Sequence, residues 1–443
     1  MKPTAVREPY LIISADTHAG LPTEQYRGYL ESGFHQALDL YLARQSATAQ
    51  ARMQLHDEEF VQEWRAEHDE QLMASWDAHK RDEELDSDGV VGEVIFPDAD
   101  AVSAATAVPF GAGIGMTGDY DPELALAGAR AHNRWLAGLC QDSPDRRRGV
   151  IVAPIVGNVD GAVREIRRAH ADGLGGGIMI PSIWGRGWPP YHDRCYDPVW
   201  SVCEELGVPV QTHAGAGPSE DLGTYLGLWA TEVAWWSARP MWFLIWTGVF
   251  ERFPGLRFGV QECGAWWVGN LLWQMDVAYD REHGTKKLAG FGGQMKRRPS
   301  DYFDTNCFIG ASTAKRRELS DRYEIGVGNI LWGNDFPHPE GTWPHTSQWL
   351  KHSFADIPVS ETRLMLGLTA VTTYGFDARK LAPIAQRICP APADLGQQEA
   401  GAGASEGLRP IGRHWLAGPD VPVIAVAQRT AGAGAPVAAA ARL

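Results

Sequence analysis

Short apolar runs bounded by glycine, proline or aspartate recur along the chain and predict β-strands. Most of them are nearly continuous in apolar residues, as expected for parallel strands that are covered on both faces. We predict eight strands in this way, over residues 10–16, 92–98, 148–155, 176–182, 208–215, 256–264, 302–310 and 330–338.

Segments with helical periodicity lie between these strands, at residues 122–141, 158–173, 196–207 and 264–284. Strands that alternate with helices in this way predict an α/β fold, a closed (β/α)8 TIM barrel. A doubly wound open sheet is the competing fold. It is disfavoured because no glycine-rich phosphate loop of the GxGxxG type follows the first strand.

Two segments do not fit the barrel repeat. Residues 20–88 are strongly charged and helical in pattern, so we predict a helical insertion after strand 1 with a solvated charged face. From residue 385 the chain is rich in proline, alanine and glycine, which is typical of linkers. We therefore expect a barrel domain over residues 1–384 and a partly flexible C-terminal extension over 385–443. Within the extension, residues 408–427 are apolar enough to dock on another part of the protein, and roughly the last dozen residues are expected to be disordered.

The most apolar region, residues 225–250, has the composition of a membrane span. Glu232, Arg239 and Pro240 interrupt it, and neither half reaches the roughly 20 residues that a span requires. We predict buried helices here instead. The N-terminal segment has only a short apolar run and no cleavage site, so no signal peptide is expected.

Composition narrows the class of protein. Of 443 residues, 44% are hydrophobic and 21% are charged, as in a globular protein, and the net charge is -15. An acidic protein is unsuited to binding nucleic acid or an anionic membrane surface, which leaves a small molecule as the expected partner. Six cysteines without CxxC spacing indicate a reducing compartment, so we expect a cytoplasmic protein.

Polar side chains stand where the predicted strands end, and the carboxyl ends of the strands form the active-site face of such a barrel. The first strand delivers Asp16 and His18, which alternation places on the same side. The fifth ends in His213, the sixth in Glu262 and the eighth in Asp335. Each alone has a structural explanation, as a cap, a turn residue or a buried histidine. Together they predict a site for a divalent metal of the zinc, manganese or iron type.

The motifs around these residues resemble the amidohydrolase superfamily. They are "SADTHAG", "LDSDGVVGEVIFPD", "YDPVWSVCEELGVPVQTHAG", "FERFPGLRFGVQECGAWWV" and "ILWGNDFPHPEGTWP", and they extend over roughly residues 8–378. The resemblance is to the second, amidohydrolase-related branch, which includes the aminocarboxymuconate-semialdehyde decarboxylase-like enzymes. It implies a homodimer and one divalent ion, most often zinc, held by Asp16, His18, His213 and Asp335.

Two departures from the family pattern bear on the chemistry. Asp16 replaces the first histidine of an HxH motif, which makes the site more anionic and widens the choice of metal toward manganese or iron. Glu262 stands where the decarboxylases of the family place a catalytic histidine, which slightly favours hydrolysis over decarboxylation.

The predicted reaction is the hydrolysis of an amide, ester, lactone or C–C bond next to a carbonyl group in a small organic substrate. A metal acidifies water, Asp335 takes its proton, hydroxide attacks the carbonyl, and Glu262 or His338 protonates the leaving group. For His338, a role in ordering the loop or contacting Asp335 is an equally good explanation.

Trp184, Arg186 and Trp188 follow the fourth strand and are candidates for clamping an aromatic or carboxylate-bearing substrate, although they serve equally well as structural residues. Non-oxidative decarboxylation of an aromatic or unsaturated acid on the same metal is the alternative function. A non-catalytic barrel that binds a ligand is a third. Release of carbon dioxide, against uptake of solvent oxygen, distinguishes the two reactions.

Overall fold

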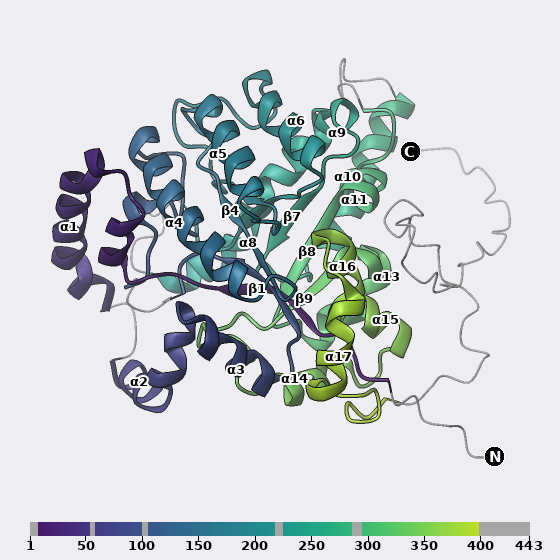
Figure 1. The fold of residues 1–443 in the computed structure, drawn as a ribbon. Helices are drawn as coiled ribbons and strands as arrows, with labels where there is room; N and C mark the ends of the chain where they lie inside the picture. The colour runs from purple at the N-terminus through teal and green to yellow at the C-terminus, as the bar shows by residue number, and fades with distance from the viewer. Residues whose placement is uncertain (1–7, 54–57, 100–104, 218–224, 286–294, 398–443) are drawn as a thin grey trace, which may run out of the picture.

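Figure 1 shows the fold of the chain in a computed structural model, which describes residues 8–53, 58–99, 105–217, 225–285 and 295–397. The predictions for residues 408–427 and for the end of the chain lie outside the described residues. Within them, no helix is long and apolar enough to cross a membrane.

The β-strands are short, buried and all parallel to their neighbours. The structure has β1 (Ile13–His18), β2 (Gly92–Phe96), β3 (Arg147–Gly149), β4 (Ile151–Val152), β5 (Ile178–Met179), β6 (Val210–His213), β7 (Phe258–Gln261), β8 (Cys307–Ser312) and β9 (Ile330–Gly333).

The third predicted strand appears as two pieces, β3 and β4, because it changes partner at Val150. The Val150 amide donates to the carbonyl of Ile95 in β2, at 2.9 Å, and the Ile151 amide donates to the carbonyl of Gly177 next to β5, at 2.8 Å. β3 and β4 therefore act as one strand that joins the two groups of paired strands, β1–β3 and β4–β9.

The first strand also meets the last. Asp335 donates its backbone N–H to the carbonyl of Asp16 at 3.0 Å, and His18 donates to the carbonyl of Phe336 at 2.7 Å. A parallel bridge between Thr17 and Phe336 accompanies these bonds. The eight strands thus form a ring, and the predicted (β/α)8 barrel is confirmed.

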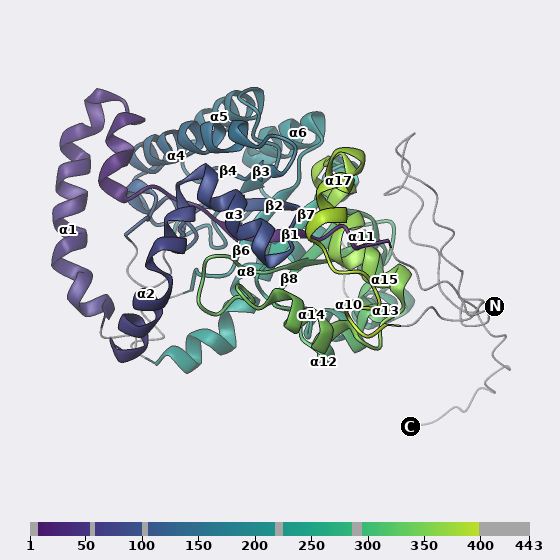
Figure 2. The same cartoon turned by 60° about the horizontal axis from the view of Figure 1, so that its bottom comes forward.

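Helices surround the ring, as Figures 1 and 2 show. Those outside the insertion are α4 (Pro122–Asp142), α5 (Val159–Ala171), α6 (Asp197–Leu206), α8 (Leu226–Trp246), α9 (Val249–Arg252), α10 (Val268–Thr285), α11 (Pro299–Asn306), α12 (Arg316–Ser320), α13 (Arg322–Ile325), α14 (Thr346–Phe354), α15 (Val359–Arg363), α16 (Thr369–Tyr374) and α17 (Ala378–Ile388). Short 3-10 turns and a π-helical stretch, η7 (Leu364–Leu368), also lie among the described residues outside the insertion.

Two sequence predictions need correction. The segment 302–310 begins as helix α11 rather than as a strand, because Pro299 at its first turn and the capping Asp301 start a helix that buries Tyr302 and Phe303. In the region 225–250, α8 is buried only in its second half. Residues 225–231 are exposed, since a long helix can extend beyond the core that covers its other end.

The predicted helical insertion after strand 1 is present. It contains η1 (Thr23–Gly28), η2 (Ser32–Phe34), α1 (His35–Met53), α2 (Glu58–Leu72), η3 (Met73–Ser75) and α3 (Ala78–Asp88). Figure 2 shows α1 and α2 to one side of the barrel, away from α17, while α3 lies against the strands. Asp77 caps the start of α3 by accepting from two backbone amides, and Gly89 ends it in the left-handed conformation at φ 77°.

Candidate metal centre

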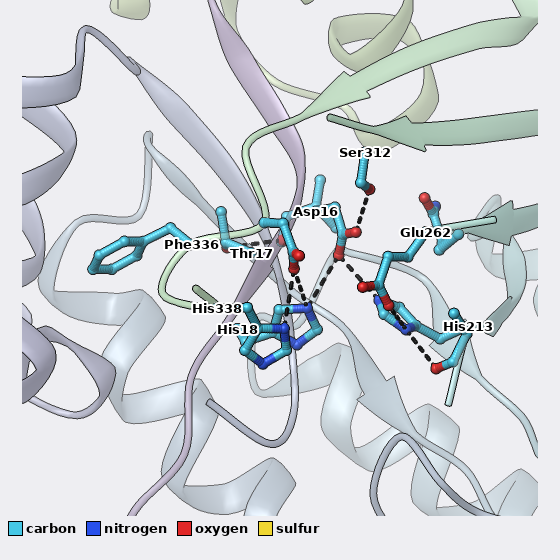
Figure 3. Close-up of polar contacts among 12 residues, drawn as sticks. Asp16, Thr17, His18, His213, Glu262, Ser312, Phe336 and His338 are labelled. Atoms are coloured by element: carbon cyan, nitrogen blue, oxygen red, sulfur yellow. Dashed lines mark hydrogen bonds and ion pairs between the residues drawn. The ribbon is translucent and has the colours of Figure 1, made fainter. Parts of the chain in front are cut away.

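Six side chains meet at the carboxyl ends of four strands, and all of them except Asp335 are labelled in Figure 3. β1 carries two of them, β6 ends in the third, and the others follow β7 and β9 directly. Five of the six are almost fully buried, and the exposed fraction of the sixth, Glu262, is 23% of its side chain. They are Asp16, His18, His213, Glu262, Asp335 and His338.

Each of the three histidines is oriented by a backbone carbonyl. In His18, Nδ1 lies 2.8 Å from the carbonyl oxygen of Pro97, and in His213, Nδ1 lies 3.0 Å from that of Ala214. In His338 it is Nε2 that lies 3.0 Å from the carbonyl oxygen of Asp98. A carbonyl can only accept, so in each ring that nitrogen carries a proton, and the other nitrogen can bind a cation when the ring is neutral.

These other ring nitrogens face carboxylates. His18 Nε2 lies 3.1 Å from Asp335 Oδ1 and 3.4 Å from Asp16 Oδ1. His213 Nε2 lies 3.1 Å from the same Asp16 oxygen, and His338 Nδ1 lies 3.1 Å from Asp335 Oδ1. Two acceptors this close repel each other unless a proton or a cation lies between them.

The side chains therefore fit a divalent cation. His18 Nε2 and Asp335 Oδ1 are both buried and have no hydrogen-bond partner, as expected for atoms that bind a metal. Potential ligand atoms form three overlapping groups in which all members lie within 4.8 Å of one another: Asp16, His18 and His213; His18, Asp335 and His338; and Glu262, Asp335, His338 and Glu340.

Charge and burial also shift the protonation of the cluster. Burial, followed by the charge of Asp335, raises the pKa of Glu262 well above its usual value. Burial lowers the pKa of His338, but the Asp335 carboxylate raises it more, so that the net value lies well above normal. This pKa shift favours the protonated form of Glu262, which stands on the side of the cluster that reaches solvent.

Two of these acids have an uncommon backbone conformation. Asp335 and Glu262 both lie in the left-handed region, at φ 59° and φ 56°, and so does Asp98, at φ 63°. This conformation is uncommon outside glycine and costs free energy, so its presence at three positions around one cluster points to a functional constraint.

Sequence reasoning missed Ser312, which donates a hydrogen bond from Oγ to Asp16 Oδ2 (Figure 3). Ser312 is the last residue of β8, so its place at a strand end was the available signal. It also missed Asp98, whose carbonyl orients His338. No residue pattern in the sequence marks a backbone carbonyl as an orienting group.

The predicted substrate residues lie in the loop after β5. Trp184 packs on Phe243, with ring centroids 4.7 Å apart, and the guanidinium of Arg239 lies 4.4 Å from its ring centre. Arg186 and Trp188 are exposed. The structure thus gives Trp184 a packing role, and the substrate role of all three residues stays a prediction.

A glycine allows strands β9 and β1 to approach closely at the site. A Cβ atom on Gly333 would lie 2.6 Å from the Cβ atom of Asp16. We expect Gly333→Ala to displace Asp16, to lower the free energy of unfolding by about 1–3 kcal/mol and to weaken metal binding, as measured by chemical denaturation and metal titration. Gly138→Ala in α4 is the control, since its Cβ would meet nothing within 4 Å. Equal metal affinity in the two variants would contradict the prediction.

A buried carboxyl supports the residue next to Asp335. Asp88 accepts hydrogen bonds from Thr346 and from the side-chain amide of Asn334, which precedes Asp335. Burial raises the pKa of Asp88 from 3.8 to about 6. The folded protein therefore holds a proton on Asp88 between pH 4 and 6 that the unfolded chain releases, and stability declines as the pH rises through this window.

Between pH 4 and pH 7 we therefore expect the free energy of unfolding of the wild-type protein to fall by up to about 3 kcal/mol relative to that of Asp88→Asn. Urea denaturation of both proteins across this range measures the difference, and the other titrating groups cancel in the comparison. Parallel pH dependences of the two proteins would show that Asp88 titrates normally.

The sequence matches a family model described as Amidohydrolase over residues 76–376, which is more than half of the chain. A search of curated proteins finds no match. The matched residues include every strand from β2 to β9 and contain both His213 and Asp335, whereas Asp16 and His18 on β1 precede them.

Several solved structures share the fold. An amidohydrolase from Mycobacterium avium subsp. paratuberculosis K-10 superposes with a TM-score of 0.59 at 20% identity, covering 83% of this chain and 99% of its own. A dihydroxybenzoic acid decarboxylase from Polaromonas sp. JS666, with bound manganese and the inhibitor 2-nitroresorcinol, has a TM-score of 0.57 at 19% identity. The superposition covers 84% of this chain and 98% of the decarboxylase. The 5-carboxyvanillate decarboxylase LigW from Sphingomonas paucimobilis has a TM-score of 0.55 at 22% identity, and the superposition covers 67% of this chain and 83% of LigW.

At these low sequence identities, the likeness to the solved structures shows a shared fold. The family assignment rests on the match of the sequence to the family model. The structure adds what the match omits, because it brings His18 of β1, a candidate ligand, against Asp335 after the last strand. The chain therefore belongs to the amidohydrolase family, in its amidohydrolase-related branch, and is an enzyme.

Proposed function

We propose that the chain is a metal-dependent hydrolase that activates water to cleave an amide, ester, lactone or C–C bond next to a carbonyl group in a small organic substrate. The observation that carries this proposal is the set of buried imidazole nitrogens that face carboxylates at the barrel mouth. Asp16, His18, His213 and Asp335 would hold one divalent ion there. The ion, when bound, supplies Lewis acidity that polarises a carbonyl group and acidifies water.

We propose zinc as this ion, because imidazole and carboxylate ligands around a buried site suit it. Two carboxylates among four ligands also suit manganese or iron, and the similar decarboxylase from Polaromonas contains manganese. Metal analysis of the purified protein decides among them.

The protein's own side chains move the protons. Asp335, held between His18 and His338, would take the proton from water. Glu262, protonated and at the solvent-reaching side, would donate a proton to the leaving group. His338 lies 3.1 Å from Asp335 and keeps that carboxylate in place, and it is the second candidate for the proton donor. Trp184, Arg186 and Trp188 would clamp an aromatic or carboxylate-bearing substrate.

A second candidate function is non-oxidative decarboxylation of an aromatic or unsaturated carboxylic acid. The observation in its favour is that two similar solved structures are decarboxylases of aromatic acids. Glu262 would then protonate the carbon that loses carbon dioxide. Substrates of both types, assayed in water enriched in heavy oxygen, separate the functions: incorporation of solvent oxygen supports hydrolysis, and release of carbon dioxide without incorporation supports decarboxylation.

We also propose a cytoplasmic homodimer, in which residues 1–384 form the catalytic domain and residues 385–443 an extension. Sedimentation of the purified protein tests the dimer, and cell fractionation tests the location. A monomer in sedimentation would contradict the oligomeric part without affecting the proposed chemistry.

A further inference from the structure

Arg81 is a fully buried arginine that the proposed chemistry does not use. It lies on α3, the last helix of the insertion, and has no exposed surface. A guanidinium offers five N–H donors, and all five are engaged. The acceptors are both carboxylate oxygens of Glu93, the carbonyls of His18 and Ala74, and the hydroxyl of Thr17, at 2.7 to 3.1 Å.

Two of these acceptors belong to the metal-binding end of β1. Arg81 Nη1 lies 2.9 Å from the carbonyl oxygen of His18, and Nη2 lies 3.1 Å from Oγ1 of Thr17, the residue between the two ligands of β1. The guanidinium also lies 5.4 Å from the ring centre of Phe336, the residue after Asp335. One side chain of the insertion thus contacts the backbone of His18, the side chain of Thr17 and the ring that follows Asp335.

Glu93 fixes the guanidinium itself. The carboxylate of Glu93 on β2 binds Arg81 through two parallel hydrogen bonds and also accepts from Thr17 at 2.9 Å. The planar guanidinium, paired in this way, has one allowed position, and lysine cannot reproduce it.

We infer that Arg81 is a positioning residue that holds His18 and Thr17 in the geometry for metal binding and so couples the helical insertion to the metal centre. The inference rests on the proposed metal-dependent function. Metal ligands must be held within about 0.5 Å of the productive geometry, which the side chains around them enforce. The insertion therefore takes part in building the site, in addition to lying beside the barrel.

A general stabilising role is the alternative, and Arg147 offers a matched control. Arg147 is equally buried and lies 3.6 Å from the same Glu93 carboxylate. It also anchors α3, through the carbonyl of Ala78 and the carboxylate of Asp82. Its hydrogen bonds go to these residues and to Leu139 rather than to β1. Replacing Arg147 therefore disturbs the same buried network without touching the metal-binding strand.

The test compares the affinity of Mn²⁺ for wild type, Arg81→Lys and Arg147→Lys by electron paramagnetic resonance of free Mn²⁺, at a temperature where circular dichroism shows all three proteins folded. We expect Arg81→Lys to bind Mn²⁺ about 10- to 100-fold more weakly, the range found when groups that orient metal ligands are removed. We expect Arg147→Lys to melt earlier than wild type but to bind Mn²⁺ with the affinity of wild type.

Thr17→Val keeps the test valid if Arg81→Lys does not fold, because it removes one hydroxyl and keeps Arg81 and Glu93 paired. Its Mn²⁺ affinity is expected to fall about tenfold. If the folded Arg81→Lys or Thr17→Val variant bound Mn²⁺ with the affinity of wild type, the inference would be overturned while the proposed function stood. The same holds if Arg147→Lys weakened Mn²⁺ binding as much as Arg81→Lys does. A wild-type protein that binds no metal would overturn the inference together with the proposed function.

Discussion

Replacing His213 with alanine is expected to remove the metal and abolish turnover. Wild-type protein purified without added metal or chelator should carry about one divalent ion per chain, and the variant none. The reason is geometric: His213 Nε2 lies 3.1 Å from Asp16 Oδ1, and both residues belong to one group of candidate ligands with His18. Inductively coupled plasma mass spectrometry measures the metal content of both proteins and also identifies the ion.

The control for this experiment is His132→Ala. His132 is equally buried and contacts the hydroxyl of Tyr26 at 2.9 Å, away from the strand ends. Its removal should lower stability and leave the metal in place. Metal retained in His213→Ala, or absent from wild type even after metal is added back, would contradict the proposed centre.

Replacing Glu262 with glutamine is expected to lower turnover about 10²- to 10⁴-fold while the metal remains bound. Burial and the charge of Asp335 raise the pKa of Glu262, and this shift favours the acid form that can donate a proton. Glutamine has nearly the same size but cannot donate that proton to a leaving group or a carbon. In wild type, activity should decline as the pH rises above the pKa of Glu262, and the variant should lack this limb of the pH profile.

Glu318→Gln is the matched control, since Glu318 is a buried carboxyl whose pKa burial also raises, outside the ligand cluster. It should turn over as fast as wild type. Full activity in Glu262→Gln would exclude Glu262 as the acid and leave His338 as the proton donor. Loss of the metal from Glu262→Gln would instead show that Glu262 is a ligand, as its place in the group with Asp335 and Glu340 allows.

The positions of most strands could be predicted from the sequence because a parallel strand covered on both faces is a short, nearly continuous apolar run. Residues 92–98 and 330–338 show this well, since β2 and β9 begin at the predicted residues. The prediction was wrong over 302–306, where Tyr302 and Phe303 lie on the buried face of α11. An apolar pair alone cannot distinguish a strand from the last turn of a helix.

The candidate ligands could be predicted for a related reason. In a barrel of parallel strands, all carboxyl ends meet at one face, so a polar residue at the end of each apolar run is brought to a common place. Asp16, His18, His213 and Asp335 follow this rule, and the structure brings them together. This rule does not predict where the loop residues Trp184, Arg186 and Trp188 lie, because the course of a loop depends on the side chains that it packs against.

The sequence by itself thus determined the barrel, the helical insertion and the identity of the candidate ligands, since these depend on local periodicity and on the common polarity of the strands. Only the tertiary structure decided how the ligands are oriented. The carbonyls of Pro97 and Asp98 select the ring nitrogens of His18 and His338, and Arg81, 63 positions after His18, holds the end of β1. Such contacts join residues that are far apart in the chain, and no local pattern records them.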